Sequence, residues 1–462
     1  MQELNLGYHY PIIYWNTACL IINAGANEEL DDNKSTQYGK IAKAIANFKQ
    51  RSIIVDRPLI NEAKFSFVPD EKNNRIIFSF KGLCGIGDDI ARAIVEHQPY
   101  SSFEDFCKRM VDTKIIGTAK MIILIKAGCF NELDSPDRME TMKKFLSRNV
   151  FTPTDKLTMQ QFNSALEYDI FPKEMEIMIR IKNFKAYALH ESFFLKNIID
   201  EGKKVPKKGY HDRYFALDER GTEFLMEHFN TCIVGTKEDG VIISEKLFNK
   251  EWDALIQPLK DYMALPETLQ LYNQKKLDST MESYASGSLE QWDMESLSYY
   301  PDRHELWNLN EPKYGVVDYN SLPEIPEVYE HTTRRVRGEI KHFPKYKIFR
   351  LAGTVLDSDN NKHLVSLLTN HGVVTCKYNK GQYSYYNKRI SEQTPAGKKK
   401  VLEESWFKRG SKIIVCGYRR EDQFVIMKYP DTVYTHTTNR IEEIYNDGTI
   451  LAQTDRKKVG EG

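Results

Sequence analysis

The sequence predicts a multidomain α+β protein with a helical N-terminal part, a mixed middle region and a small C-terminal β-barrel. Three observations support this prediction. Glycine turns flank short apolar helices between residues 67 and 134, helix-like and strand-like patterns alternate between 135 and 290, and five short β-rich runs lie between 346 and 430. Apolar residues three to four apart are typical of helices, whereas short runs of β-branched and aromatic residues are typical of strands.

The composition is that of an ordinary soluble globular protein, with 41% hydrophobic and 28% charged residues in 462. No run of 18 apolar residues occurs, so we expect no membrane-spanning segment. The N-terminus lacks the basic-then-apolar pattern of a signal peptide. The seven cysteines are scattered and form no CxxC pair, which predicts a reduced cytoplasmic protein with neither a disulfide framework nor a zinc site.

The charge is distributed unevenly although the chain is neutral as a whole. Residues 333–430 contain 21 Lys and Arg against 8 Asp and Glu, so they carry +13 and the remainder carries −13. A basic domain on an acidic body is consistent with a local site for a polyanion. A solvated basic face without a ligand explains the same numbers.

The N-terminal 66 residues predict a helix over 41–48, followed by an interruption at Pro58. A short strand is expected at 76–80. In the middle region, the pattern predicts a helix over 172–185 and short strands at 232–234 and 241–243.

The C-terminal part contains five predicted strands, at 348–356, 363–369, 373–378, 412–418 and 423–428. Turn residues separate most of them, and a longer polar segment, 381–410, follows the third strand. Five strands with a long connection after the third predict an OB-type barrel over 346–430. Five prolines between residues 291 and 345 predict a linker there. Residues 431–462 are expected to form a peripheral tail that frays from residue 457 onwards.

The stretch from Lys81 to Ile94 combines a Gly-Ile-Gly turn with the start of an apolar helix. Gly85 and Gly87 permit a tight hairpin, and Ile86 is expected to pack inward. Free backbone N–H groups at such a turn can bind a phosphate, which makes the stretch a candidate helix-hairpin-helix that grips duplex DNA, with Lys81 as a further contact. An ordinary helix N-terminus has the same pattern.

A second glycine turn ends the helix that precedes Gly128, and we take it as the second copy of the motif. Paired hairpins can contact both strands of a duplex, with Lys126 as a phosphate contact. A lysine at the end of a helix also favours the helix dipole, which is an equally good explanation of Lys126. The resulting tandem helix-hairpin-helix domain is expected to span 67–134.

The order of these motifs resembles the α subunit of bacterial DNA polymerase III, the C-family replicase. The order begins with a predicted strand, which is followed by Lys81-Gly-x-x-Gly-x-Gly87 and a helix. Two further motifs come after that helix, first Phe103-x-Asp-Phe-Cys107 and then Ile125-Lys-Ala-Gly128. Further similar segments are His9-Tyr-Pro11, resembling the end of the fingers, Pro58-Leu-Ile-Asn61, and Trp292–Tyr300, followed by His304 and Leu306, which resembles Glu-x-Leu-Gly-x-Tyr…His-Pro-Leu. Three residues depart from the family pattern: Leu59 replaces an acid, Ser298 a glycine and Glu305 a proline.

The resemblance implies a role for each part of the chain. Residues 1–66 would end the fingers, the hairpins would hold newly made duplex, and the OB barrel would lie near single-stranded template. In the barrel, cations and tyrosines would bind phosphates and stack on bases, with the tyrosines as barrel packing in the alternative explanation. The expected contacts there are Arg350, Lys377, Tyr383, Tyr385 and Lys388.

The family's catalytic aspartates lie upstream of the fingers end and have no counterpart here. We therefore expect no catalytic and no metal-binding residue in this chain, and no cofactor, with magnesium held by the palm of a partner chain. A split polymerase would explain a chain that starts near the fingers end. It would be inactive alone and work in the bacterial nucleoid or a phage-infected cell.

The region between the hairpins and the barrel would help to bind a sliding clamp. The two candidate clamp-binding peptides, Gln257–Tyr262 and Gln270–Tyr272, match the family's peptide poorly. A stand-alone DNA-binding or clamp-associated accessory protein remains the alternative to a split polymerase. No sequence feature supports a separate enzyme within 135–290.

Overall fold

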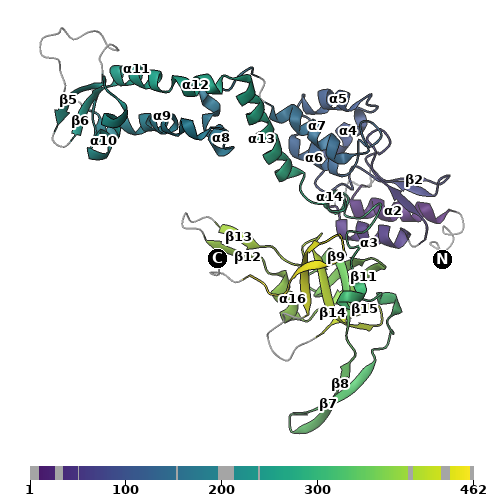
Figure 1. Cartoon of the computed structure of the whole chain (residues 1–462). Coiled ribbons are helices and arrows are strands. Elements are labelled where there is room, and N and C mark those ends of the chain that lie inside the picture. The colour runs from purple at the N-terminus through teal and green to yellow at the C-terminus, as the bar shows by residue number, and fades with distance from the viewer. Residues whose placement is uncertain are drawn as a thin grey trace. The chain divides into compact units, whose positions relative to one another are not determined.

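The computed structural model describes residues 10–26, 35–49, 51–151, 154–195, 213–237, 240–393, 399–427 and 437–457. These residues divide into two compact units, of which unit 1 comprises 1–142 and 287–462 and unit 2 comprises 143–286. Figure 1 shows their elements. The predicted α+β multidomain class is confirmed, since unit 1 contains a helical region and a closed β-barrel, and unit 2 mixes helices with a small sheet.

Unit 1 begins with two helices and a three-stranded sheet. The helices are α2 (Ile12–Ala24) and α3 (Tyr38–Lys49). The sheet has the order β1-β3-β2, formed by β1 (Ile54–Asp56), β2 (Val68–Asp70) and β3 (Arg75–Ile77). The predicted helix over 41–48 lies within α3, which buries one apolar face: Ile41, Ala42, Ile45 and Phe48.

Short helices with glycine turns between them follow the small sheet. They are α4 (Asp88–Glu96), α5 (Phe103–Phe106), a π-helical turn (Cys107–Val111), α6 (Thr118–Lys126) and α7 (Arg138–Val150). Their core contains three buried phenylalanines whose rings meet edge to face with centroids 5.0–5.1 Å apart: Phe103, Phe106 and Phe130. Such aromatic contacts hold the short helices together where each alone would be unstable.

Five strands close into the predicted barrel: β9 (Phe349–Asp359), β10 (Leu364–Thr369), β11 (Gly372–Lys377), β14 (Lys412–Arg420) and β15 (Gln423–Ile426). β9 pairs with β10 and β14, and β15 pairs parallel with β11 and antiparallel with β14. α16 (Lys380–Asn387) and the hairpin β12 (Ile390–Gln393) and β13 (Lys399–Glu403) lie between the third and fourth barrel strands. The OB-type barrel is thus confirmed. Lys428, at the end of the fifth predicted run, lies outside the described residues.

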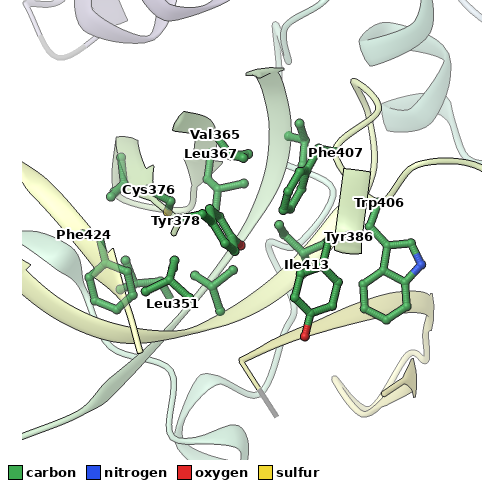
Figure 2. Close-up of a cluster of buried hydrophobic side chains, with 14 of the residues drawn as sticks. Leu351, Val365, Leu367, Cys376, Tyr378, Tyr386, Trp406, Phe407, Ile413 and Phe424 are labelled. Carbon is green, nitrogen blue, oxygen red and sulfur yellow. The ribbon is translucent and has the colours of Figure 1, made fainter. Parts of the chain in front are cut away.

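The barrel interior is filled by alternate side chains from its strands, as Figure 2 shows. Its four largest buried side chains come from outside the strands: Tyr378, Tyr383, Tyr386 and Trp406. The rings of Tyr386 and Trp406 stack with centroids 5.2 Å apart. The connection after the third strand therefore contributes to the core.

The prediction that residues 291–345 form a linker is wrong for much of this segment. It holds most of α14 (Leu289–Leu297), the short α15 (Glu311–Tyr314), and a two-stranded ribbon formed by β7 (Val328–Val336) and β8 (Glu339–Tyr346). Pro344 lies within β8. A two-stranded ribbon leaves alternate N–H groups facing water, so a proline there need not remove a hydrogen bond of the ladder.

The expected peripheral tail over 431–462 is also wrong where the structure describes it. β16 (Thr438–Ile444) pairs with β14, and β17 (Ile450–Gln453) pairs with β16. Arg456 is 5% exposed and forms an ion pair with buried Glu403, with its Nε 2.8 Å from Oε2. Because a buried cation must keep its partner, this pair fixes the end of the chain on the barrel.

The fraying expected from residue 457 onwards is contradicted at its first position. Lys457 donates its amide to the same carboxylate of Glu403, at 3.1 Å. Residues 458–462 lie outside the described residues.

Ser298 ends α14 at a position that suits glycine. Its φ of +67° lies in the left-handed region, which favours residues without a Cβ atom. The Ser298 side chain is fully buried, and its hydroxyl lies 2.9 Å from the Sγ of Cys84. This contact holds the serine side chain at a position whose backbone conformation suits glycine.

Unit 2 contains a three-stranded antiparallel sheet, β4 (Tyr214–Ala216), β6 (Gly240–Ser244) and β5 (Ile233–Lys237), in that order. Its α-helices are the larger part of α7, from residue 143 on, and α8 (Phe162–Glu167), α9 (Glu176–Ala188), α10 (Glu219–His228), α11 (Glu245–Leu255), α12 (Gln257–Met263) and α13 (Pro266–Tyr284). The helix predicted over 172–185 and the two predicted strands are confirmed. One core cluster lies around Phe215 and Phe248, and a second lies around Phe162 and Tyr272.

The His304 side chain of unit 1 predicts a pH dependence of stability. Burial lowers its pKa to about 4, and its Nδ1 accepts a hydrogen bond from the Leu306 amide at 3.0 Å. Below a pH of about 6.5 the unfolded chain takes up a proton that the folded chain does not, so stability falls as the pH drops towards 4. His304→Asn, which keeps an acceptor and does not titrate, should lose about 1–2 kcal/mol less between pH 7 and pH 5 in urea unfolding.

Candidate nucleic-acid interface

The first hairpin, residues 83–87, lies between the small sheet and α4. Ile86 is 4% exposed and holds the turn from inside, as expected. Gly85 has a φ of +83°, whereas Gly87 is the N-cap of α4 with φ −83° and ψ 167°. Within the described residues, the amides of Gly87 and Asp88 donate no hydrogen bond. The helix start therefore offers free N–H groups, as the prediction required.

Two features make the first hairpin less suited to a phosphate. The amide of Gly85 donates to the Tyr38 hydroxyl at 3.3 Å, so it is already bonded. α4 also begins with Asp88 and Asp89, and Lys81 forms an ion pair with Asp88. Lys81 is thus placed on a carboxylate, where it stabilises the turn, and the carboxylates oppose an approaching anion.

The second hairpin lies at residues 112–117, not at the glycine turn of Gly128 where the sequence predicts it. Ile116 is fully buried, and Gly117 is the N-cap of α6 with φ −84° and ψ 165°. This backbone matches that of Gly87, and the buried isoleucine precedes it in the same way. Lys114 has a φ of +64°, a value that glycine adopts more readily. A tandem pair of hairpins therefore exists, but its second member starts α6 instead of ending it.

The start of α6 has a more favourable charge for DNA than the start of α4, although Asp112 lies in the second hairpin. The first turn of α6 has no acidic residue, and Lys114 is exposed beside it. Lys120 donates from Nζ to the carbonyl of Gly85 at 2.5 Å, so the two hairpins lie side by side. In the described part of the chain, the amides of Gly117 and Thr118 donate no hydrogen bond. These groups form a positive helix N-terminus of the kind that binds anions.

Lys126 and Gly128, which the sequence predicts to contact DNA, make contacts within the protein. Lys126 forms an ion pair with Glu295, its Nζ 2.8 Å from Oε2, and lies over the ring of Trp292. Gly128 has a φ of +78° just after α6, and a Cβ atom there would lie 3.2 Å from Cδ of Arg57. The Ile-Lys-Ala-Gly motif is therefore the end of a helix, where a glycine leaves room for an arginine.

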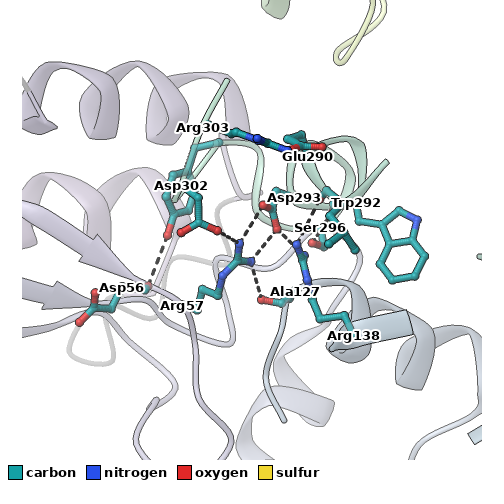
Figure 3. A network of polar contacts seen from close by, with 12 residues as sticks. Asp56, Arg57, Ala127, Arg138, Glu290, Trp292, Asp293, Ser296, Asp302 and Arg303 are labelled. Atoms are coloured by element: carbon teal, nitrogen blue, oxygen red, sulfur yellow. Dashed lines mark hydrogen bonds and ion pairs between the residues drawn. The ribbon is translucent and has the colours of Figure 1, made fainter. Parts of the chain in front are cut away.

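Two arginines and one aspartate join the hairpin region to α14 (Figure 3). Asp293 is 3% exposed and accepts hydrogen bonds from Arg57 at 2.6 and 2.9 Å and from Arg138 at 2.6 Å. The same arginines donate to the last carbonyls of α6, those of Lys126 and Ala127. Burial lowers the pKa of Arg138, while the carboxylates of Asp293 and Asp302 outweigh burial and raise the pKa of Arg57. This network fixes α6, and with it the second hairpin.

Tyr383 and Tyr385, the two tyrosines predicted to stack on bases, pack in or against the barrel core, as in the alternative explanation. Tyr383 is 3% exposed, belongs to the barrel core and donates from its hydroxyl to Asn360 at 2.8 Å. Burial raises its pKa. Tyr385 is partly buried and packs against the same core. A base cannot stack on Tyr383 in this fold, which corrects that expectation, and the ring of Tyr385 is only partly accessible.

The three predicted cations of the barrel are accessible to different degrees. Arg350 is exposed and donates to the carbonyl of Tyr314 at 3.2 Å. Lys388 is exposed in the loop after α16. Lys377, at the end of β11, donates to the carbonyl of exposed Lys362 in the β9–β10 turn. In OB folds the second and third strands and their adjoining loops form the ligand surface, and Lys362 and Lys377 lie on that part of the barrel.

The two candidate clamp-binding peptides are helical and partly buried. Leu259 of α12 is fully buried, and Tyr272 of α13 is 3% exposed, both within the second core cluster of unit 2. Neither peptide can present these side chains to another protein without unfolding part of that core. Among the described residues, there is no group of three or more His, Cys, Asp and Glu that could hold a metal ion, and no helix long and apolar enough to cross a bilayer.

Residues 52–140 match the helix-hairpin-helix motif. The chain is also 40% identical, over 467 aligned positions, to a protein named "Probable DNA polymerase YorL" from Bacillus subtilis (strain 168). The same identity and alignment length hold for a "DNA-directed DNA polymerase" of Bacillus phage SPbeta. Each alignment covers 99% of this chain and 34% of the relative, so the chain spans about one third of the length of the curated relatives it matches. The motif and the two relatives together support a DNA-binding, polymerase-related role.

Proposed function

We propose that this chain is the DNA-holding part of a replicative DNA polymerase of the bacterial polymerase III α type. The observation that carries the proposal is the pair of glycine-capped helix N-termini at Gly87 and Gly117, which lie side by side with free amides. They would hold the sugar-phosphate backbone of duplex product without reading its sequence. The two relatives, both named as DNA polymerases, support the assignment to a polymerase.

The barrel would contact the single-stranded template through its cations. Lys362, Lys377 and Arg350 are the side chains that we assign to phosphates, and Lys388 adds a further exposed charge. Base stacking would have to use partly exposed aromatic side chains, because Tyr383 lies in the core. We expect single-strand binding to be weaker and less selective than duplex binding for this reason.

The catalytic aspartates and their magnesium ions would belong to a palm outside these 462 residues. Two such metal ions activate the primer hydroxyl and stabilise the leaving oxygen. The chain would add grip and processivity, and it would act in the bacterial nucleoid or in a phage-infected cell. A sliding clamp would have to bind through residues other than Leu259 and Tyr272.

A salt titration of duplex binding tests the proposal. Each phosphate that a cationic site neutralises contributes a slope of about −0.9 to the plot of log K against log salt concentration. With at least one phosphate per hairpin, the purified chain should show a slope of about −2 or steeper on a fluorescent duplex. A flat response would exclude an electrostatic grip on DNA.

Primer extension tests the division of labour. The chain alone should extend no primer, and its addition to a palm-bearing polypeptide of a relative should lengthen the products made per binding event. Duplex binding without any effect on such a palm would favour a stand-alone accessory protein. Extension by the chain alone would contradict the proposal.

A further inference from the structure

The ribbon β7–β8 extends from the barrel as an isolated pair of antiparallel strands (Figure 1). Its two-residue turn consists of Arg337 and Gly338, with φ values of +51° and +85°. Positive φ at both positions is the hallmark of the type I′ turn that matches the twist of a tight hairpin. The sequence therefore specifies a well-defined ribbon with an arginine at its tip.

At the base of the ribbon the ring of Tyr346 meets that of Tyr418, and β7 and β8 otherwise contact mainly each other. No residue of β7 or β8 is buried, and the side chains of Ile340 and Phe343 are 67% and 41% exposed. A two-stranded hairpin alone is at best marginally stable in water. A ribbon of this length that covers no core is consistent with a surface that becomes covered by a ligand.

The positive charge of the ribbon is concentrated at its tip. Residues 333–342 contain four Lys and Arg against one acidic residue. At the base, Lys345 pairs with Glu330 at 2.6 Å and Lys347 with Glu327 at 3.3 Å. In the described part of the chain, no carboxylate lies within 4.0 Å of the guanidinium groups at the tip, those of Arg334, Arg335 and Arg337. The base is thus neutralised internally, whereas at the tip Lys341 lies 3.9 Å from Glu339 and, among the described residues, the three arginines have no carboxylate partner.

The strand register distributes these cations over both faces. Arg334 is paired with Lys341, and Arg335 is paired with Ile340. Directly paired residues share a face and successive residues alternate, so Arg334 and Lys341 lie on one face and Arg335 lies on the other. Arg337 occupies the turn between them. Cations on two faces and at the tip suit a ligand that has phosphates on both sides of the ribbon.

We propose that the ribbon enters the major groove of duplex DNA, with its tip arginines on the two flanking phosphate backbones. The inference rests on the proposed function, since it takes duplex DNA as the ligand. Two strands about 4.8 Å apart with their side chains fit a major groove about 12 Å wide, whereas the minor groove of about 6 Å is too narrow. Arginine also suits phosphates well, because its planar fork can bond two oxygens at once.

The test compares two ribbon variants of the full chain that remove the same number of positive charges. R334Q/R337Q neutralises two tip cations, and K345Q/K347Q neutralises two paired cations at the base. With a fluorescent duplex of about three helical turns, R334Q/R337Q should lose about tenfold or more in affinity at moderate salt. Its salt slope should become shallower by about 1.8, the contribution of two phosphates. The base variant should change the affinity by about threefold at most.

Two further measurements distinguish the contribution of the ribbon to DNA binding from that of the hairpins. Single-stranded oligonucleotide binding should be unchanged in R334Q/R337Q, and a loss confined to single strands would overturn the assignment to the major groove. The hairpin variant Gly117→Asp is measured in parallel. Wild-type duplex affinity in R334Q/R337Q together with a loss in Gly117→Asp would overturn the ribbon proposal and leave the proposed function standing. Wild-type affinity in both variants would overturn both.

Discussion

Replacing Asp293 by asparagine is expected to destabilise unit 1 by about 3–5 kcal/mol, the usual cost of leaving buried charges without their partner. The carboxylate is 3% exposed and is shared by Arg57 and Arg138. A neutral amide keeps the shape of the side chain but leaves two buried guanidinium groups facing each other. The single amide oxygen could accept only part of the hydrogen bonds that the two carboxylate oxygens accept.

Asp302→Asn is the matched control, because Asp302 also pairs with Arg57 but its side chain is 77% exposed. Exposed ion pairs contribute about 0–1 kcal/mol, so this variant should lie close to wild type. Urea unfolding measures the stability of both variants, and hydrogen exchange of peptides from α6 and α14 locates the loss. Equal stabilities of the two variants would show that Asp293 is not the anchor of α6. Duplex binding should weaken in Asp293→Asn under mild urea, where the second hairpin loses its support.

The barrel could be predicted from sequence because its signals are local. Each strand is a short run rich in β-branched residues, and each turn carries Asn, Asp or Gly. The order of pairing then follows from the small number of ways in which five such strands close. The position of the tyrosines could not be predicted in the same way. Tyr383 and Tyr385 lie on a helix that packs against the barrel, so alternation along a strand did not apply to them.

The first hairpin was predictable and the second was only partly so. Gly-Ile-Gly is a local signal, whereas the second hairpin places Lys114 where a glycine would be easier to detect. The recurring Ile-Gly pair before a helix, at 86–87 and again at 116–117, is the signal that would have found it. The role of Gly128 could not be inferred, because the arginine network it accommodates joins residues 236 positions apart.

The ribbon and the last strands were missed for different reasons. Prolines predict a linker because they interrupt central strands, yet a two-stranded ribbon has no central strand. The segment 438–453 is polar, and it adds to the sheet at an edge where few side chains need to be buried. Its anchor, the pair formed by Arg456 and Glu403, is a contact between distant residues that composition does not reveal.

Replacing Gly117 by aspartate should weaken duplex binding about tenfold or more while the fold remains intact. The N-cap position accepts aspartate well, and a Cβ atom at residue 117 would meet nothing within 4 Å. The new carboxylate would lie at the N-terminus of α6, where we expect a DNA phosphate. One lost phosphate contact and the added repulsion together account for about 1.4 kcal/mol or more, the free energy of a tenfold change in affinity.

Gly117→Ser is the matched control, because serine caps a helix as aspartate does but carries no charge. It should stay within about threefold of wild type, a difference of less than about 1 kcal/mol. The same pair of substitutions at Gly87 separates the two hairpins. Gly87→Asp should have the smaller effect, because α4 already begins with two aspartates and a third adds less to an existing repulsion. Fluorescence anisotropy with one duplex measures all four variants. If Gly117→Ser lost as much duplex affinity as Gly117→Asp, space and not charge would limit the site. If Gly87→Asp lost more affinity than Gly117→Asp, the stronger phosphate contact would belong to the first hairpin.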